Sequence, residues 1–241
     1  MKEQNELIVW FTVLGVIFLF LIAYLYYGKK RYNPFEKPMP TGRLFVIFAI
    51  FAVVMRLAMA YNLPGYGTDM DCFRAWANNV YTGGIENFYT GDFFADYPPI
   101  YIYILYFFGF IRNVFDLGLA SPMYGMLLHL PAIICDVAGA YIVYRLAKQK
   151  FRAPVALMLS TLLLLNPAVM FNSSVWGQMD IILTLMLVLT IYLLVKDKLI
   201  WAFVAFIVAF LIKPQASMIL PILGVVFIRN IICLLYTSRC V

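Results

Sequence analysis

Long apolar segments limit the fold of this 241-residue chain more than any other feature of its sequence. A helix that spans a membrane needs about 20 mostly apolar residues. Seven segments approach or exceed that length: residues 7–27, 44–61, 123–146, 154–171, 179–195, 199–212 and an incomplete run over 216–228. The sequence therefore predicts an all-α fold that crosses the membrane several times.

The composition excludes several classes of protein. Hydrophobic residues make up 64% of the chain and charged residues 12%, whereas soluble domains average roughly 45–50% and about 25%. A soluble enzyme, a disordered tail and a nucleic-acid-binding module are therefore excluded. The net charge of +6 does not change this, because in a membrane protein the side on which basic residues lie matters more than their sum. The four cysteines have no metal-ligand or CxxC spacing, so they predict neither a zinc site nor a disulfide framework.

The two ends of the chain differ from the part between them. Residues 7–27 follow no basic region and precede no small-residue cleavage site, so we expect an anchor and not a signal peptide. Residues 233–241 (CLLYTSRCV) back-translate into a transposase-adapter sequence followed by the start of its reverse complement. We therefore expect the natural protein to continue beyond residue 232, and predict three parts: an extra anchor with a basic loop (1–42), a transmembrane module incomplete at its C-terminus (43–232) and an adapter-derived tail (233–241).

One apolar segment, residues 100–115, is short for a membrane span, and the basic residues decide its placement. Cytoplasmic connections are rich in Lys and Arg, and twelve such residues lie in 29–43, in 145–152, in 196–198 and at Arg229. All twelve fall on one side only if residues 100–115 do not cross the bilayer. We therefore expect this segment to be a helix in the membrane interface, within one long outer loop over residues 62–122.

This predicted outer loop is long and acidic. Connections between helices usually have about 2–8 residues, and much longer ones are often functional. Its charged residues are Asp69, Asp71, Glu86, Asp92, Asp96 and Asp116, against Arg74 and Arg112. We expect the chemistry of the protein on this outer side, at the extracytoplasmic face of the plasma membrane.

The first polar cluster on the outer side is residues 65–71 (GYGTDMD). It precedes a pattern over residues 70–81 that predicts a helix. Thr68 or Asp69 could cap that helix. Asp71 points to a different side of it, so at least one of the two carboxylates stays available for acid–base work.

Two further clusters lie on the same side. In Asp96-Tyr97-Pro98-Pro99 the prolines fix backbone angles and predict a rigid corner, with a solvated Asp96 at a stiff helix start as the alternative. Asn166-Pro167 and residues 172–180 (NSSVWGQMD) lie at the predicted outer junction of two spans, where a short connection needs no such concentration of polar groups. Gly177 allows a sharp turn there.

Charged side chains inside spans are costly and usually face a partner or a cavity. Arg56 lies within two turns of the outer surface, where it could snorkel or pair with Asp69. His129 and Asp136 are seven positions apart and share a helix face, either as ligands or in interhelical hydrogen bonds. Lys213 lies on the outer side against the orientation rule, so we interpret it as a cation that binds an anionic group.

These motifs resemble, in their order and common side, those of the GT-C membrane glycosyltransferases that use polyprenyl- or dolichyl-phosphate sugars. The similarity is greatest to prokaryotic relatives of the GPI mannosyltransferases, and it covers residues 43–228. His129 departs from the family, whose members often have Arg or Lys there. The residues that carry the resemblance are Asp69 with Trp76 seven positions later, the corner Asp96-Tyr97-Pro98-Pro99, the turn over 176–180 and Asp136.

The resemblance implies a GT-C helical bundle and a catalytic role for the module over residues 43–232. It also implies inverting transfer of mannose or another hexose from a polyprenyl-phosphate donor to a lipid, glycan or protein acceptor. Asp69 would take the proton of the acceptor hydroxyl, and Lys213 and Arg56 would stabilise the leaving phosphate. The residues expected to position the sugar or the acceptor are Asp71, Trp76, Asp96, Tyr97, Trp176, Gln178 and Asp180.

The chemistry implied by the resemblance requires no cofactor. Asp69, Asp71 and Asp180 could nevertheless hold a divalent metal ion. Two other functions stay open at this point. A transporter or lipid flippase would bind ions near mid-membrane on broken helices, which Asp136 favours, whereas a scaffold subunit would not need the outer carboxylates.

Overall fold

The computed structural model describes residues 40–90 and 94–237, together with Val13, Gly15 and Ile17. In these residues the regular structure is helical and contains no strand, which confirms the predicted all-α class. The predicted anchor over residues 7–27 lies almost entirely outside the described residues. The elements are α2 (Thr41–Asn62), α3 (Gly67–Gly83), η1 (Phe88–Thr90), α4 (Pro99–Val114), α5 (Pro122–Ala147), α6 (Ala153–Leu164), α7 (Pro167–Phe171), η2 (Asn172–Trp176), α8 (Asp180–Val195), α9 (Leu199–Ile212), η3 (Pro214–Ile219) and α10 (Leu220–Thr237).

Three described helices are long and apolar enough to cross a membrane: Thr41–Asn62, Pro122–Ala147 and the continuous run Ala153–Trp176. The predicted spans over 179–195 and 199–212 form α8 and α9, which have 16 and 14 residues. At a rise of 1.5 Å per residue these helices are about 24 and 21 Å long, less than the roughly 30 Å of the hydrocarbon core. The three long apolar helices identify the chain as a membrane protein. The count of seven spans stays a prediction.

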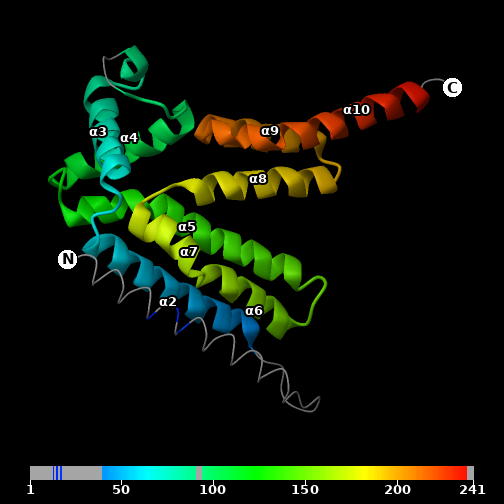
Figure 1. The fold of residues 1–241 in the computed structure, drawn as a ribbon, viewed down its shortest axis with the longest axis horizontal. Coiled ribbons are helices and arrows are strands. Elements are labelled where there is room, and N and C mark those ends of the chain that lie inside the picture. The colour runs from blue at the N-terminus through cyan, green and yellow to red at the C-terminus, as the bar shows by residue number, and fades with distance from the viewer. Residues whose placement is uncertain (1–12, 14, 16, 18–39, 91–93, 238–241) are drawn as a thin grey trace.

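The helices form two groups (Figure 1). In one group α2, α5 and α6 lie side by side around a core that includes Ala52, Ala140 and Leu164. In the other, α8 and α9 form an antiparallel pair around Leu183, Phe206 and other apolar residues. Small residues on α2, α5 and α6 allow the helix backbones to approach closely, as is usual for helices that pack in membranes.

Helices α3 and α4 pack on each other at one end of the molecule (Figure 1), where α2 ends and α5 begins. The predicted helices over residues 70–81 and 100–115 correspond to α3, which extends a few residues beyond the predicted bounds at both ends, and α4, which begins and ends one residue earlier than predicted. Close packing depends on Gly109, because a β-carbon there would overlap the carbonyl oxygen of Ala77. The interfacial placement of α4 stays a prediction.

The connections at the two ends of the bundle differ in charge. The α5–α6 and α8–α9 connections, on the right in Figure 1, contain five basic residues and Asp197. The opposite end, with α3 and α4, contains the described acidic residues of the predicted outer loop. The division matches the predicted sorting of charge, while the side of the membrane that each end faces stays a prediction.

The predicted span over 154–171 differs in its course from the sequence-based expectation. We expected Asn166-Pro167 at the outer junction of two spans, but it lies inside the run Ala153–Trp176 as a break between α6 and α7. Pro167 occupies the first turn of α7, where no hydrogen-bond donor is needed, and Oδ1 of Asn166 caps that turn by accepting from the amide of Ala168 at 2.9 Å. The helix then continues into η2, a five-residue π-helix, where we had expected a connection.

Candidate functional site

Asp69 lies in the first turn of α3 and faces the end of η2. Its Oδ2 accepts a hydrogen bond from Nε1 of Trp176 at 2.8 Å and another from Nε2 of Gln178 at 2.6 Å. Both donors reach the same oxygen, and among the described residues no hydrogen bond uses Oδ1. The predicted capping role is wrong, because α3 begins at Gly67 without a side-chain cap.

Gln178 connects Asp69 to a second charged pair. Its amide donates to Asp69 through Nε2, while its Oε1 accepts from Nζ of Lys213 at 3.3 Å and from the hydroxyl of Tyr97 at 3.4 Å. Lys213 also forms an ion pair with Oδ1 of Asp180 at 2.6 Å. A continuous chain of polar contacts therefore connects three segments. It runs from the negative Asp69 through the neutral Gln178 and the positive Lys213 to the negative Asp180.

Tyr97 brings the rigid corner before α4 into this cluster. Its ring lies under the ammonium of Lys213, with 5.6 Å between Nζ and the ring centroid, a cation–π distance. The same ring packs against Phe73 and Trp76 of α3. Trp76 is buried, and its Nε1 donates to the carbonyl oxygen of Phe94 at 2.7 Å. Trp76 therefore stabilises the rigid corner through its ring and its indole nitrogen, while its contact with sugar or acceptor stays a prediction.

The turn after η2 aims Trp176 and Gln178 at Asp69. The amides of Gly177 and Gln178 both donate to the carbonyl oxygen of Asn172, at 3.2 and 3.0 Å. Gly177 has a φ of +93°, a conformation that glycine adopts without strain. A β-carbon at this position would lie 3.1 Å from Nε2 of His129 and closer still to Sδ of Met70.

A backbone contact ties the same turn to the start of α3. The amide of Tyr66 donates to the carbonyl oxygen of Trp176 at 3.0 Å, and the two aromatic rings pack with 4.9 Å between their centroids. Tyr66 belongs to the first polar cluster, but no sequence pattern predicted this contact. No pattern predicted the contact of Asn172 either, whose Nδ2 lies 3.4 Å from Oδ2 of Asp180.

Burial and neighbouring groups shift the pKa values of three side chains in and next to this cluster. Burial lowers the pKa of Lys213, but its interactions with Asp180 and Tyr97, first of all the hydrogen bond to Asp180, more than offset that effect, so its pKa lies above the ordinary value. Burial raises the pKa of the Tyr97 hydroxyl, which therefore stays a neutral donor. Burial, and then the charges of Asp69, Asp96 and Asp71, raise the pKa of the Cys72 thiol.

Two predicted site carboxylates stand apart from the hydrogen-bonded cluster. The side chain of Asp71 is 74% exposed and pairs with Arg74 at 3.1 Å. Asp96 is exposed at the start of the rigid corner. In the described part of the chain no group of three or more His, Cys, Asp or Glu side chains is arranged to hold a metal ion, so the suggested set of Asp69, Asp71 and Asp180 does not come together.

Arg56 differs most from its sequence-based prediction. It neither snorkels to the surface nor pairs with Asp69, because it is completely buried and forms an ion pair with Asp136 at 2.9 Å. The interhelical alternative is therefore confirmed for Asp136. His129 is also buried, but its Nδ1 contacts the carbonyl oxygen of Gly125 in its own helix at 2.8 Å. Arg56 therefore lies outside the cluster around Asp69, whereas Lys213 belongs to it, and phosphate binding by either residue stays a prediction.

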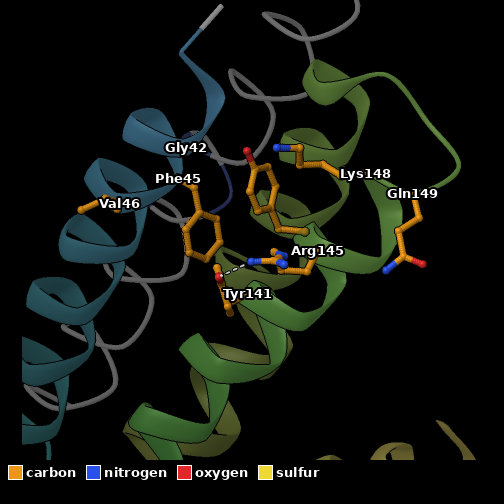
Figure 2. Close-up of a pocket in the computed structure, with 8 residues that line it drawn as sticks. Gly42, Phe45, Val46, Tyr141, Arg145, Lys148 and Gln149 are labelled. Atoms are coloured by element: carbon orange, nitrogen blue, oxygen red, sulfur yellow. Dashed lines mark hydrogen bonds between the residues drawn. The ribbon is translucent and has the colours of Figure 1, made fainter.

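A groove of about 500 Å³ lies at the opposite, basic end of the bundle, between α2 and α5 (Figure 2). Phe45, Tyr141 and Tyr144 form its aromatic wall. On the α5 side of the groove, Nη1 of Arg145 donates to the hydroxyl of Tyr141 at 3.1 Å. None of the predicted site residues lines this groove, so it is separate from the cluster around Asp69.

Comparison with known proteins assigns the family. Residues 97–236, more than half of the chain, match the family described as dolichyl-phosphate-mannose-protein mannosyltransferase. The matched region includes Tyr97, Trp176, Gln178, Asp180 and Lys213 but begins after Asp69. It ends four residues inside the predicted adapter-derived tail, and that tail stays a prediction. No curated protein and no solved structure matches the chain. The chain therefore belongs to the dolichyl-phosphate-mannose-protein mannosyltransferase family.

Proposed function

We propose that this protein transfers a hexose from a polyprenyl-phosphate donor to an acceptor hydroxyl, with inversion at the anomeric carbon. The family supports a membrane glycosyltransferase that uses a lipid-phosphate sugar. The proposed role of Asp69 as the base depends on the geometry of its carboxylate. Both of its described hydrogen-bond donors hold Oδ2, so the carboxylate is fixed in orientation while Oδ1 is available to accept a proton.

In the proposed reaction, Asp69 takes the proton of the acceptor hydroxyl as the oxygen attacks the anomeric carbon. A general base must lie within hydrogen-bond distance of that proton, and Asp69 is half-buried at the end of the bundle where a membrane-bound donor and an outer acceptor can meet. The bond from the anomeric carbon to the phosphate oxygen breaks on the opposite face of the sugar. The attacking and leaving groups therefore lie on opposite sides, and inversion follows.

Lys213 is proposed to stabilise the leaving phosphate. Negative charge builds up on the phosphate oxygens as the sugar departs, and a positioned cation lowers the energy of that transition state. The ammonium is already oriented by Gln178 and Asp180. Its raised pKa keeps it cationic over the physiological pH range. We place this chemistry on the extracytoplasmic side, since the opposite end of the bundle has the basic connections.

A transporter or flippase is the main alternative. Asp136 was the residue that favoured it, but this carboxylate is buried against Arg56 and Ser173. A transported ion would have to displace a buried guanidinium in order to bind there. The predicted site residues Tyr97, Gln178 and Asp180, which remain partly exposed, lie instead at the end of the bundle that contains Asp69.

The experiment that tests the proposal uses the full chain purified in detergent and reconstituted into liposomes. Radiolabelled hexose is supplied either on polyprenyl phosphate or on a nucleotide, together with lipid, glycan or peptide acceptors. We expect label to appear in an acceptor only from the polyprenyl-phosphate donor, and the product to have the anomeric configuration opposite to that of the donor. Transfer from the nucleotide donor alone, or retention of configuration, would contradict the proposal.

Replacing Lys213 with Met should lower the transfer rate by roughly 10²- to 10³-fold, since loss of one oriented group that stabilises developing negative charge typically costs that much. Because the pKa of Lys213 is raised, the size of this loss should stay constant between about pH 6 and 9. Lys213→Arg is the matched control that keeps the charge. If Lys213 only neutralises Asp180, the double change Lys213→Met and Asp180→Asn would restore activity, and the phosphate role would be refuted.

A further inference from the structure

A buried polar network connects α2, α5 and the run Ala153–Trp176. Arg56 on α2 and Asp136 on α5 form an ion pair in which both side chains are at most 1% exposed. Oγ of Ser173, in η2, donates to the same carboxylate oxygen, Oδ2 of Asp136, at 2.6 Å. Nη2 of Arg56 also donates to the carbonyl oxygen of Leu164 at 2.8 Å, at the last residue of α6.

The proposed reaction uses none of these groups, yet burying them in an apolar bundle is costly. Charged groups at such depth usually have a functional reason, and single π-helical turns inside α-helices often lie at functional sites. Here the network forms hydrogen bonds on both sides of the break in the run Ala153–Trp176. Arg56 binds the end of α6 before the break, and Asp136 binds Ser173 in the π-helical turn after it.

The turn that Asp136 holds is the one that leads to Asp69. Ser173 lies three residues before Trp176 and five before Gln178, the two donors to Asp69. Between them the chain is tightly wound, because Gly177 and Gln178 both donate to the carbonyl oxygen of Asn172. A displacement of Ser173 therefore moves both donors together, since no flexible segment separates them.

We propose that the buried network of Arg56, Asp136 and Ser173 positions the π-helical turn so that Trp176 and Gln178 hold the carboxylate of Asp69. These three are positioning residues that act through the turn and do not touch the substrate. The consequence for catalysis rests on the proposed function of Asp69, whereas the geometric part can be measured without any activity.

Fluorine NMR of the full chain labelled with 5-fluorotryptophan tests the geometric part. The chain has four tryptophans, and single Trp→Phe changes assign their resonances. Asp69→Asn gives the reference shift for an altered acceptor at Trp176. We expect Ser173→Ala, which removes one hydroxyl from the network, to shift or broaden the Trp176 resonance, while Trp201 at the far end of α9 does not move.

Ser160→Ala is the matched control. Ser160 is also completely buried, but its hydroxyl donates to the carbonyl oxygen of Leu157 within α6 and does not reach the network. Its Trp176 resonance should equal that of the parent chain. A second variant, Arg56→Met with Asp136→Leu, replaces the ion pair with apolar side chains and should displace the Trp176 resonance in a folded protein. An unchanged Trp176 resonance in both Ser173→Ala and the double variant would overturn the proposal.

Kinetics then separate positioning from the catalytic role of Asp69. Under the proposed function, Ser173→Ala should lower kcat by roughly 10- to 100-fold through misplacement of the base, with little change in the KM for the donor. A change confined to KM would contradict positioning of the base. If Asp69→Asn keeps full activity while Ser173→Ala still shifts Trp176, the proposed function fails and the positioning role stands.

Discussion

Replacing Asp69 with Asn should lower the rate of sugar transfer by about 10²- to 10⁴-fold, the usual contribution of a general base. Asn has nearly the same shape and keeps one acceptor oxygen for Trp176 or Gln178, so the turn should stay close to its position. What it loses is the ability to take the proton of the acceptor hydroxyl. Initial rates with the polyprenyl-phosphate donor measure the effect, and helical content by circular dichroism verifies the fold.

The matched control for this change is Asp116→Asn. Asp116 is an exposed aspartate on the connection between α4 and α5, with a φ of +48°, a conformation that Asn also tolerates. The control protein should transfer sugar at the parent rate. Asp69→Asn activity within a few-fold of that rate would refute the assignment of Asp69 as the base.

Replacing Arg56 alone with Met should destabilise the protein by about 3–5 kcal/mol, because removing one partner of a buried ion pair leaves an uncompensated charge. Asp136 would stay 2% exposed, with Ser173 as its remaining donor among the described residues. The loss should appear as a lower unfolding midpoint in detergent, followed by circular dichroism with urea or heat.

The double change Arg56→Met and Asp136→Leu should recover most of that stability. Replacing a buried ion pair with apolar residues of similar volume is often neutral or stabilising, since neither charge then has to leave water. If the double variant unfolds as readily as Arg56→Met, the loss comes from packing and not from the unpaired charge. A stable double variant also keeps the fluorine experiment interpretable, because the turn is then examined in an intact bundle.

Local patterns in the sequence were enough to predict most helices. The apolar runs predicted α2 and α5 to within three residues, since a long continuous run leaves few other ways to satisfy the backbone in an apolar environment. The spacing of apolar residues after Gly67 predicted α3, and the apolar run over residues 100–115 predicted α4 to within one residue at each end. The polar clusters identified Asp69, Tyr97, Gln178 and Asp180 before any of their contacts were known.

Contacts between distant segments could not be predicted in this way. Arg56 and Asp136 are 80 positions apart, and one sequence contains nothing that pairs them. Capping of its own helix was one alternative for Asp69, but donors 107 and 109 residues away bind it instead. The π-helical turn was also missed, because residues 172–176 have the composition of a loop while tertiary packing against Asp136 keeps them wound.

The hydrogen bond from Tyr66 to the carbonyl oxygen of Trp176 has a consequence for the order in which the protein is made. The ribosome synthesises Asp69 well before Trp176, and both α5 and α6 are made in between. A nascent chain therefore contains Asp69 for a long interval without the two donors that orient its carboxylate. The cluster around Asp69 forms only when η2 docks against α2 and α5, so under the proposed function we expect a partly inserted chain to be inactive.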